Sequence, residues 1–251
     1  MSTIVAFDSG RSSRPGPDGR AFFATRNKLL KLLPANEAGL LIVISELVSV
    51  TSKEILFKPD GSLDHVHFPE DCVISFVTEL HDGHGVEALT VGNDGFSPVA
   101  LFNGVDSMSC RGIGQITGKA WRIRRSDFLS VLRSCPELRR VLGLYNQLSF
   151  ETVAQSVACN RLHEIESRCV RWLLMSHDRV GRDSFNLTQE FLSQMLGVRR
   201  AGVTVAIGLL ERQGFLSHTR GNITIVNRKG LEERSCECYA TVKRREALIL
   251  R

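Results

Sequence analysis

The sequence predicts an α+β protein in which an N-terminal β-roll, a long connecting helix and a helical C-terminal domain with a β-hairpin follow one another. Three observations predict this order. Short β-prone runs separated by turn residues fill the first half, and apolar residues recur at helical spacing after Pro136. Two short helical patterns and a hairpin pattern then stand near the C-terminus. A chain of 251 residues is long enough for two hydrophobic cores.

Residues 1–26 predict a flexible tail, because glycine, serine, arginine and proline are frequent there, as in Arg14–Pro17. This segment has no apolar core followed by a small-residue cleavage site, so we expect no secretory signal. No run of about 18 or more apolar residues occurs in the chain, so we expect no membrane span. These features together predict a cytoplasmic protein.

Residues 27–134 are predicted to form the β-roll (jelly-roll) domain. Its first part, residues 27–50, predicts one or two short helices. From about residue 48 to residue 128, turn residues interrupt β-prone runs roughly every ten residues, which is typical of a sandwich or rolled barrel. The predicted β-prone runs are 55–57, 65–68, 72–80, 86–91 and 114–123.

Residues 135–159 predict a long helix, with Pro136 suited to its first turn. Its residues at helical or heptad spacing are Leu138, Val141, Leu142, Tyr145, Leu148, Thr152, Val153 and Val157. Such a helix can pack on the β-roll of its own chain, and it can also pair with a second copy along an exposed stripe. We predict a dimerisation helix.

Positive charge is concentrated in the last third of the chain. Residues 159–251 carry 16 basic and 10 acidic side chains, whereas residues 1–158 carry 16 and 17. A basic domain attached to a nearly neutral one indicates a polyanionic partner, because cationic side chains displace the counterions condensed on phosphates. Nucleic acid is therefore the expected ligand.

Residues 160–235 contain a helix-turn-helix pattern. Thr188 suits the N-cap of a first short helix, and Gly197 suits a tight turn after it. A second helix follows, and its inner apolar positions are Val198, Val203, Ile207 and Leu210. Two crossed helices joined by a glycine turn have the geometry that places the second helix in a DNA major groove.

Polar residues around this second helix are the candidate DNA contacts, because arginine bonds guanine or phosphate and threonine bonds a base edge or a phosphate. Two β-prone runs, 215–219 and 223–226, flank a turn that contains Arg220, which predicts the wing of a winged helix-turn-helix. The predicted DNA-binding residues are Thr188, Gln189, Arg199, Arg200, Gly202, Thr204 and Arg220.

An alternative function comes from His65 and His67, which alternate on a predicted strand before Glu70. Histidines two apart on a strand point to one face and can chelate a metal. This stretch resembles a cupin strand, although the spacing to Glu70 is one residue short and the second cupin motif is not visible. The alternative is thus a cupin-like metalloprotein or metalloenzyme with an accessory DNA-binding domain.

The seven cysteines are scattered without the spacing of a disulfide framework. Only Cys236 and Cys238, in the predicted C-terminal tail at 236–251, are close enough to suggest a redox pair or half of a soft-metal site. A disulfide across one residue is strained. The sequence contains no P-loop, dinucleotide fingerprint or Ser/His/Asp constellation, so we predict no catalytic residues, no cofactor, no metal and no enzymatic activity.

The order of these elements resembles the CRP/FNR superfamily of bacterial transcription regulators. The resemblance covers about residues 27–231 and rests on Phe68–Glu70, Gly92–Phe96, Arg122–Phe128, Leu187–Leu192 and Gly197–Arg200. It implies a cyclic-nucleotide-binding-like β-roll and a homodimer that binds an inverted-repeat operator in double-stranded DNA. It also implies RNA polymerase as a partner, and it leaves the effector unassigned.

The sequence departs from the family pattern at the ligand site of the β-roll. Nucleotide-binding members carry a glutamate for the ribose and an arginine for the cyclic phosphate, whereas Gly95–Ala100 has no acidic residue and Met108 stands near the arginine position. A buried phosphate without a charged partner is costly, so we predict no cAMP or cGMP there. Ala201 and Val205 replace the family's glutamate and arginine in the recognition helix, which predicts a different operator.

Overall fold

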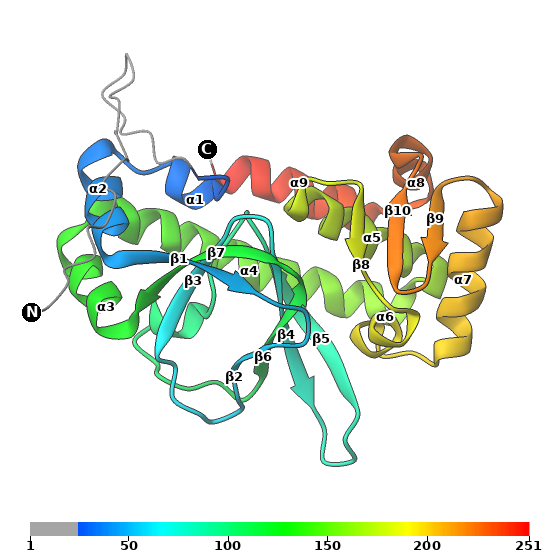
Figure 1. The fold of residues 1–251 in the computed structure, drawn as a ribbon, viewed down its shortest axis with the longest axis horizontal. Coiled ribbons are helices and arrows are strands. Elements are labelled where there is room, and N and C mark those ends of the chain that lie inside the picture. Colours follow the sequence, from blue (N-terminus) through cyan, green and yellow to red (C-terminus); the bar gives the residue numbers. More distant parts are fainter. Residues whose placement is uncertain (1–24, 251) are drawn as a thin grey trace, which may run out of the picture.

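The computed structural model describes residues 25–250, which form two lobes joined by helix α4 (Pro136–Leu162) (Figure 1). The β-roll and helices α1 to α3 make the first lobe, and helices α5 to α8 with a small sheet make the second. The predicted order of β-roll, long helix and helix-turn-helix is confirmed. The tail predicted at residues 1–26 lies almost wholly outside the described residues. None of the helices in residues 25–250 is long and apolar enough to cross a membrane.

Seven strands build the β-roll as two antiparallel sheets, one with the order β1-β7-β3 and one with the order β2-β6-β4-β5. A short 3-10 helix, η1 (Val99–Leu101), lies between the fifth and sixth strands. The strands are β1 (Ser45–Val50), β2 (Ile55–Phe57), β3 (His65–Pro69), β4 (Val73–Glu79), β5 (Gly85–Val91), β6 (Arg111–Ile116) and β7 (Gly118–Arg124).

The prediction for residues 27–50 is correct in its first part and wrong in its last. Helices α1 (Lys28–Lys31) and α2 (Ala35–Ile44) are present, but the following residues form β1. Leu47 pairs with Trp121 across the ladder to β7. Pairing with a strand far along the chain outweighs the local helical preference here, which sequence periodicity does not reveal.

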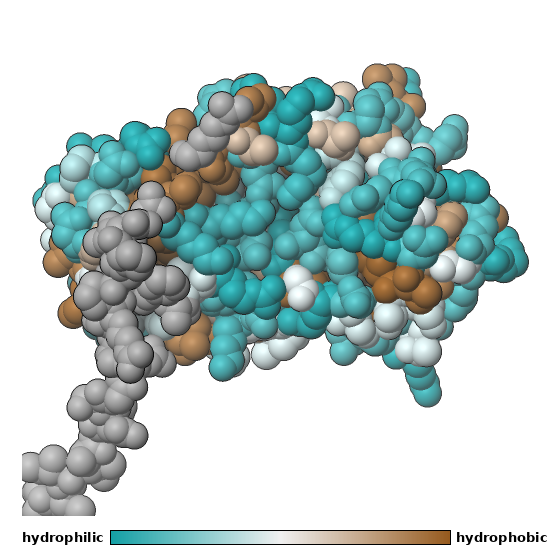
Figure 2. All heavy atoms as spheres, turned by 90° about the horizontal axis from the view of Figure 1, so that it is seen from above, coloured by the Kyte–Doolittle hydropathy of each residue, from teal (hydrophilic) through white to brown (hydrophobic). Residues whose placement is uncertain are grey.

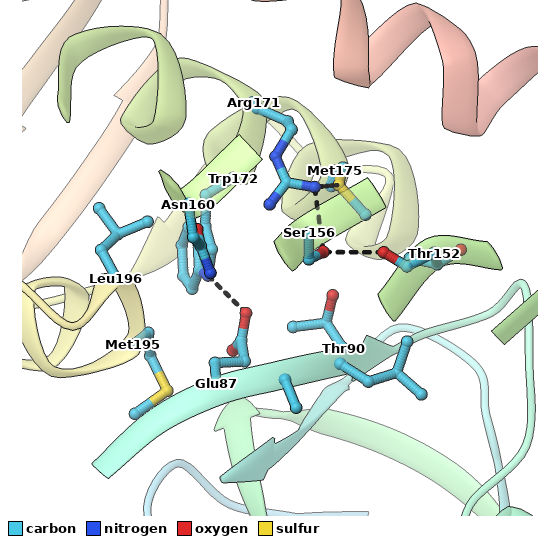
Figure 3. Close-up of a pocket in the computed structure, with 12 residues that line it drawn as sticks. Glu87, Thr90, Thr152, Ser156, Asn160, Arg171, Trp172, Met175, Met195 and Leu196 are labelled. Carbon is cyan, nitrogen blue, oxygen red and sulfur yellow. Dashed lines mark hydrogen bonds between the residues drawn. The ribbon is translucent and has the colours of Figure 1, made fainter. Parts of the chain in front are cut away.

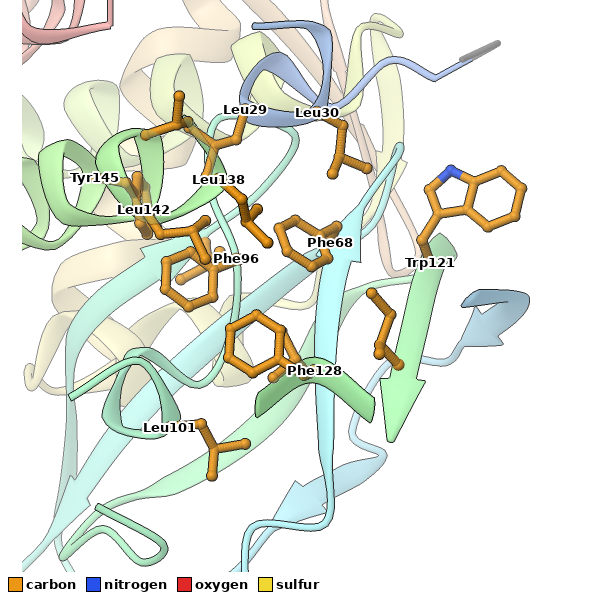
Figure 4. Packing of buried hydrophobic residues seen from close by; sticks show 14 of the residues in the cluster. Leu29, Leu30, Phe68, Phe96, Leu101, Trp121, Phe128, Leu138, Leu142 and Tyr145 are labelled. Carbon is orange, nitrogen blue, oxygen red and sulfur yellow. The ribbon is translucent and has the colours of Figure 1, made fainter. Parts of the chain in front are cut away.

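Aromatic side chains fill the β-roll, and α4 closes it (Figure 4). The ring centroid of Phe96 lies 5.8 Å from that of Phe68 and 5.4 Å from that of Tyr145 on α4. Helix α3 (Arg125–Ser134) contributes Phe128, which is fully buried beside them. Asn27 fixes the entering chain, because its side-chain amide donates hydrogen bonds to the carbonyls of Pro69 and Gly95 at 3.0 and 2.8 Å.

The apolar stripe predicted on α4 mostly faces the interior of its own chain. The stripe residues before Val153 are buried, Val153 is partly buried against the core, and Val157 is 66% exposed. A different face of α4 is open to solvent, and it carries Phe150, 71% exposed, with Ala154 one turn further on. The helix therefore has two apolar faces, one used within the chain and one uncovered.

The second lobe runs from α5 to α8, and the chain then returns along α4 as α9. Its elements are α5 (Ile165–Val180), β8 (Ser184–Asn186), α6 (Gln189–Leu196), α7 (Arg200–Arg212), β9 (Leu216–Thr219), β10 (Asn222–Ile225), α8 (Arg228–Arg234) and α9 (Glu237–Ile249). Phe191, Leu192, Val203 and Ile207 belong to one continuous core that also includes Val73 and Ile116 of the β-roll.

The tail predicted at 236–251 is instead mostly helical, since α9 spans Glu237–Ile249. Tyr239 and Val242 are buried, and Arg245 pairs with Glu151 of α4 with an Nε–Oε2 distance of 2.5 Å. The sequence did not indicate this helix, because a few buried apolar positions give only a weak helical pattern in a segment with many charged residues. The surface seen from the side of α9 is mainly hydrophilic (Figure 2).

Candidate nucleic-acid interface

Helix α6 begins and ends as predicted. Thr188 caps it, because the threonine Oγ1 accepts a hydrogen bond from the Phe191 N–H at 3.1 Å. Gly197 ends it in the left-handed region with φ of 62°, a conformation that strains other residues. The cap and the turn fix where the next helix starts. Leu192 and Met195 bury the inner face of α6.

Helix α7 presents its basic start to solvent. Arg199 is the N-cap residue, Arg200 is the first helical residue, and no acidic residue lies in the first turn. Both arginines and Thr204 are exposed, and neither arginine forms an ion pair with another described residue. The positive end of the helix dipole adds to their charge. This end of α7 can therefore bind a phosphate or a guanine edge.

Two of the predicted DNA contacts have different surroundings from those expected. Gly202 is predicted on the outer face of α7, but a Cβ built there would lie 3.0 Å from Ile165 Cδ1, so the glycine serves close packing on α5. Gln189 is partly buried, and its Oε1 accepts a hydrogen bond from Thr204 Oγ1 at 2.7 Å. This bond joins α6 to the outer face of α7.

The predicted wing is present and carries one more strand than expected. Strands β9 and β10 pair around a two-residue turn, Arg220–Gly221, in which Gly221 has φ of 77°. Strand β8 pairs with β10 on its other side, so the sheet order is β8-β10-β9. Arg220 is exposed at the tip. The wing therefore projects a cation from a supported hairpin.

A buried ion pair connects the two lobes. Arg179 of α5 donates from Nε to both carboxylate oxygens of Asp94, at 3.1 and 3.0 Å, and from Nη1 to Thr90 Oγ1. Gly92 makes room, because a Cβ there would lie 2.5 Å from the Arg179 Cβ. Burial alone would raise the pKa of Asp94, but the charges of Arg179 and Lys28 outweigh it and lower the pKa.

A second polar contact between the lobes lies in a narrow pocket (Figure 3). Glu87 of β5 accepts hydrogen bonds from Trp172 Nε1 at 2.9 Å and from Ser75 Oγ at 2.6 Å. Burial raises the pKa of Glu87 to about 7, although both hydrogen bonds favour the carboxylate. Arg171 of α5 and Ser156 of α4 also line this pocket.

Glu87→Gln is expected to stabilise the protein at about pH 8 by roughly 1–2 kcal/mol, less than the full pKa shift implies because the residue is only partly buried. The pKa is 4.5 in the unfolded chain and about 7 in the fold, so the folded state is penalised as the pH rises through this window. Thermal unfolding at about pH 4 and pH 8 measures this difference. Glu233→Gln, at an exposed site, is the control, and an equal gain at both pH values would contradict the assignment.

The loop Gly95–Ala100 is followed by Met108, and the charged residues on either side of Met108 in the sequence are already paired. Arg111 pairs with Glu79 at 2.9 Å, and Asp106 pairs with Arg125 at 3.5 Å. Met108 packs against the core. The interior beside this loop is filled by Phe96 and its aromatic neighbours.

The cupin-like alternative gains no site from the structure. His65 and His67 lie on β3 with ring centroids 6.4 Å apart, and burial lowers the pKa of His67 to about 4. Glu70 is used elsewhere, since it accepts hydrogen bonds from Trp121 Nε1 at 2.7 Å and from the Arg26 N–H at 2.6 Å. Across residues 25–250, no third cysteine, histidine or carboxylate gathers with the two histidines.

Cys236 and Cys238, by contrast, do gather further candidate ligands. Cys159 and His163 lie beside them, although 77 positions separate Cys159 from Cys236. The sequence indicates only the half formed by Cys236 and Cys238, because Cys159 and His163 stand on the opposite side of the helix-turn-helix in the chain.

The structure thus combines an N-terminal β-roll with a C-terminal winged helix-turn-helix, in which α7 has an exposed basic start. Residues 167–234 match the family model of the Crp-like helix-turn-helix domain. No curated protein matches the sequence. The C-terminal domain is therefore of the Crp-like helix-turn-helix type, and the fold of the described residues is shared with solved regulators of the CRP/FNR family.

Several solved structures share the fold at low identity. A CRP-family regulator from Thermus thermophilus matches with a TM-score of 0.62 and 14% identity, covering 75% of this chain and 96% of that one. FixK2 from Bradyrhizobium japonicum matches with a TM-score of 0.59 and 16% identity, covering 77% and 98%. The c-di-GMP-responsive regulator CLP from Xanthomonas campestris matches with a TM-score of 0.58 and 13% identity, and the match covers 76% of this chain and 98% of that one.

Proposed function

We propose that this regulator binds an inverted-repeat operator as a homodimer, with α7 in the major groove and the wing on the adjacent backbone. The observation that carries the proposal is the pair of exposed, unpaired arginines at the start of α7. Thr188, Gln189 and Thr204 flank them and suit phosphate or base contacts. Arg220 at the wing tip supplies a further phosphate contact.

Base readout by this helix combines charged and apolar contacts. Arg199 and Arg200 suit guanine or phosphate. Ala201 and Val205, the latter 69% exposed, present methyl groups on the same open face of α7. Methyl groups of this kind suit the C5-methyl of thymine. We therefore expect half-sites that combine a guanine with neighbouring thymines.

Dimerisation is proposed along the uncovered face of α4. Phe150, Ala154 and Val157 follow one another at spacings of four and three residues, which is the spacing of a coiled-coil seam. Phe150 is 71% exposed and also lines a groove between α4 and α9. Two copies of α4 packed along this seam would bury these side chains. Their symmetry would present two α7 helices to two half-sites.

Control by cAMP at the family's usual site is not part of the proposal. The absence of an acidic residue in the loop Gly95–Ala100 and the ion pair between Arg111 and Glu79 leave ribose and phosphate without partners. The aromatic side chains packed beside the loop, including Phe96, fill the space that a base would need.

Selection of bound sequences from random duplex DNA tests the proposal. Wild-type protein is expected to select an inverted repeat, with half-sites one helical turn apart. Phe150→Glu is expected to weaken dimerisation by at least about 30-fold and to abolish selection of the paired half-sites, because each dimer would bury two carboxylates in its seam. Sedimentation measures the dimer.

Val43→Glu is the matched control, since Val43 is 84% exposed on α2, away from the seam. Selection of a single, asymmetric site by wild-type protein would contradict the dimer. An unchanged dimerisation constant for Phe150→Glu would contradict its interface.

A further inference from the structure

Three cysteines and one histidine meet where the chain enters and leaves the DNA-binding lobe. Cys159 lies in the last turn of α4, and His163 is the residue that ends this helix. Cys236 and Cys238 stand at the start of α9. Their ligand atoms all lie within 4.8 Å of one another. Helices α5 to α8 thus lie between the two halves of this cluster in the chain, and the cluster brings together the segments that precede and follow them.

The distances suit one tetrahedral metal ion. Zinc–sulfur bonds of about 2.3 Å and zinc–nitrogen bonds of about 2.0–2.1 Å place tetrahedral ligands about 3.8 Å apart for two sulfurs and about 3.5 Å apart for sulfur and nitrogen. Here the Cys159 and Cys236 sulfurs are 3.7 Å apart, and Cys238 Sγ lies 3.5 Å from His163 Nδ1. An iron–sulfur cluster of several metal atoms needs more widely spaced ligands than these.

The surroundings of the cluster also suit a metal. The three thiols are buried in a small group of their own, separate from both large cores. His163 turns Nδ1 toward Cys238, while its Nε2 lies 3.3 Å from the Glu237 carboxylate, the arrangement that orients a ligating histidine. Gln155 Nε2 donates a hydrogen bond to Cys238 Sγ at 3.0 Å.

We propose that Cys159, His163, Cys236 and Cys238 form a closed site for Zn²⁺ that pins both chain connections of the DNA-binding lobe. Three thiolates and a neutral imidazole are the ligands of many structural zinc sites. Arg168 and Arg171, both buried on α5, interact electrostatically with Cys159 and offset the excess negative charge of three thiolates.

This site would set the angle between α7 and the dimer helix. With the ion bound, the end of α4 and the start of α9 are held together, so α5 to α8 cannot swing freely about α4. Without the ion, the two connections are joined only by noncovalent contacts. This consequence rests on the proposed operator binding, whereas the metal site itself does not.

Total metal analysis of the full-length protein, purified under reducing conditions, tests the site. We expect about one zinc ion per chain in the wild type and far less than one in Cys238→Ser and His163→Ala. Cys110→Ser, which changes a buried thiol on the β-roll, should keep its zinc. His163→Cys should also keep it, because four thiolates complete the same tetrahedron. Circular dichroism confirms folding of each variant.

Cobalt substitution adds a readout that does not depend on DNA. Co²⁺ bound by the wild type should show the visible absorption of a tetrahedral thiolate site, and Glu237→Ala should lower the metal affinity by about 10–100-fold. Failure of the wild type to hold zinc or to take up cobalt would overturn the site.

Operator binding by the zinc-loaded and chelated wild type separates the two proposals. We expect chelation to weaken operator binding by about tenfold, within the usual range of coupling between sites. Equal affinity in both states would overturn the pinning role while leaving the zinc site standing. A zinc-loaded protein that selects no DNA would instead overturn the proposed function.

Discussion

Replacing both Arg199 and Arg200 by alanine is expected to weaken operator binding by at least about 100-fold, because each lost base or phosphate contact costs about 1–3 kcal/mol and a dimer loses four arginines. The two side chains are exposed, unpaired and placed at the positive end of α7. Removing phosphate contacts should also flatten the dependence of binding on salt. Fluorescence anisotropy with a selected operator, measured at several salt concentrations, gives both quantities.

A charge-matched control separates local contacts from overall charge. Lys31→Ala/Arg133→Ala removes the same two charges from exposed positions in the β-roll lobe. It should leave operator affinity within about threefold of the wild type, since charges beyond a Debye length are largely screened at physiological salt. Wild-type affinity in the Arg199/Arg200 variant would show that α7 does not enter the groove. Single substitutions would then distinguish base readout from phosphate contact through the selected sequence.

The features that could be predicted from the sequence are those encoded within a few neighbouring residues. The Thr188 cap, the Gly197 turn and the Arg220–Gly221 hairpin each depend on local backbone geometry, so residue type alone identifies them. The β-roll is predictable for the same reason, from turn residues at regular spacing. The orientation of Gly202 could not be predicted in this way. A small shift in helix phase turns a residue from the side that would face DNA to the side that packs on α5.

The features that could not be predicted join residues far apart in the chain. Helix α9 is stabilised by α4 and α5, the proposed zinc ligands come from both sides of the DNA-binding lobe, and β1 depends on β7. None of these pairings leaves a periodic or compositional signal. The contact between Arg179 and Asp94 belongs to this class too, because the two residues are 85 positions apart and each resembles an ordinary surface charge in the sequence.

Asp94→Ala is expected to lower the free energy of unfolding by about 3–5 kcal/mol, because it leaves the buried Arg179 guanidinium without its charged partner. The pKa of Asp94 is lowered in the fold, so its contribution is present above the unfolded value of 3.8 and is lost as the pH falls through the folded pKa. The difference in the free energy of unfolding between Asp94→Ala and the wild type should therefore become smaller in acid. Urea unfolding at neutral pH and at about pH 3 measures it.

A double substitution distinguishes the ion pair from general packing damage. Arg179→Met combined with Asp94→Ala removes both charges, and it should recover much of the stability that Asp94→Ala loses, because no unpaired charge remains buried. Glu137→Ala breaks the solvent-exposed pair with Arg140 on α4 and should cost less than about 1 kcal/mol. A double variant as unstable as the sum of its single variants would mean that the lobes are held together by apolar packing alone. In that case Asp94 and Arg179 would not couple the β-roll to the DNA-binding lobe.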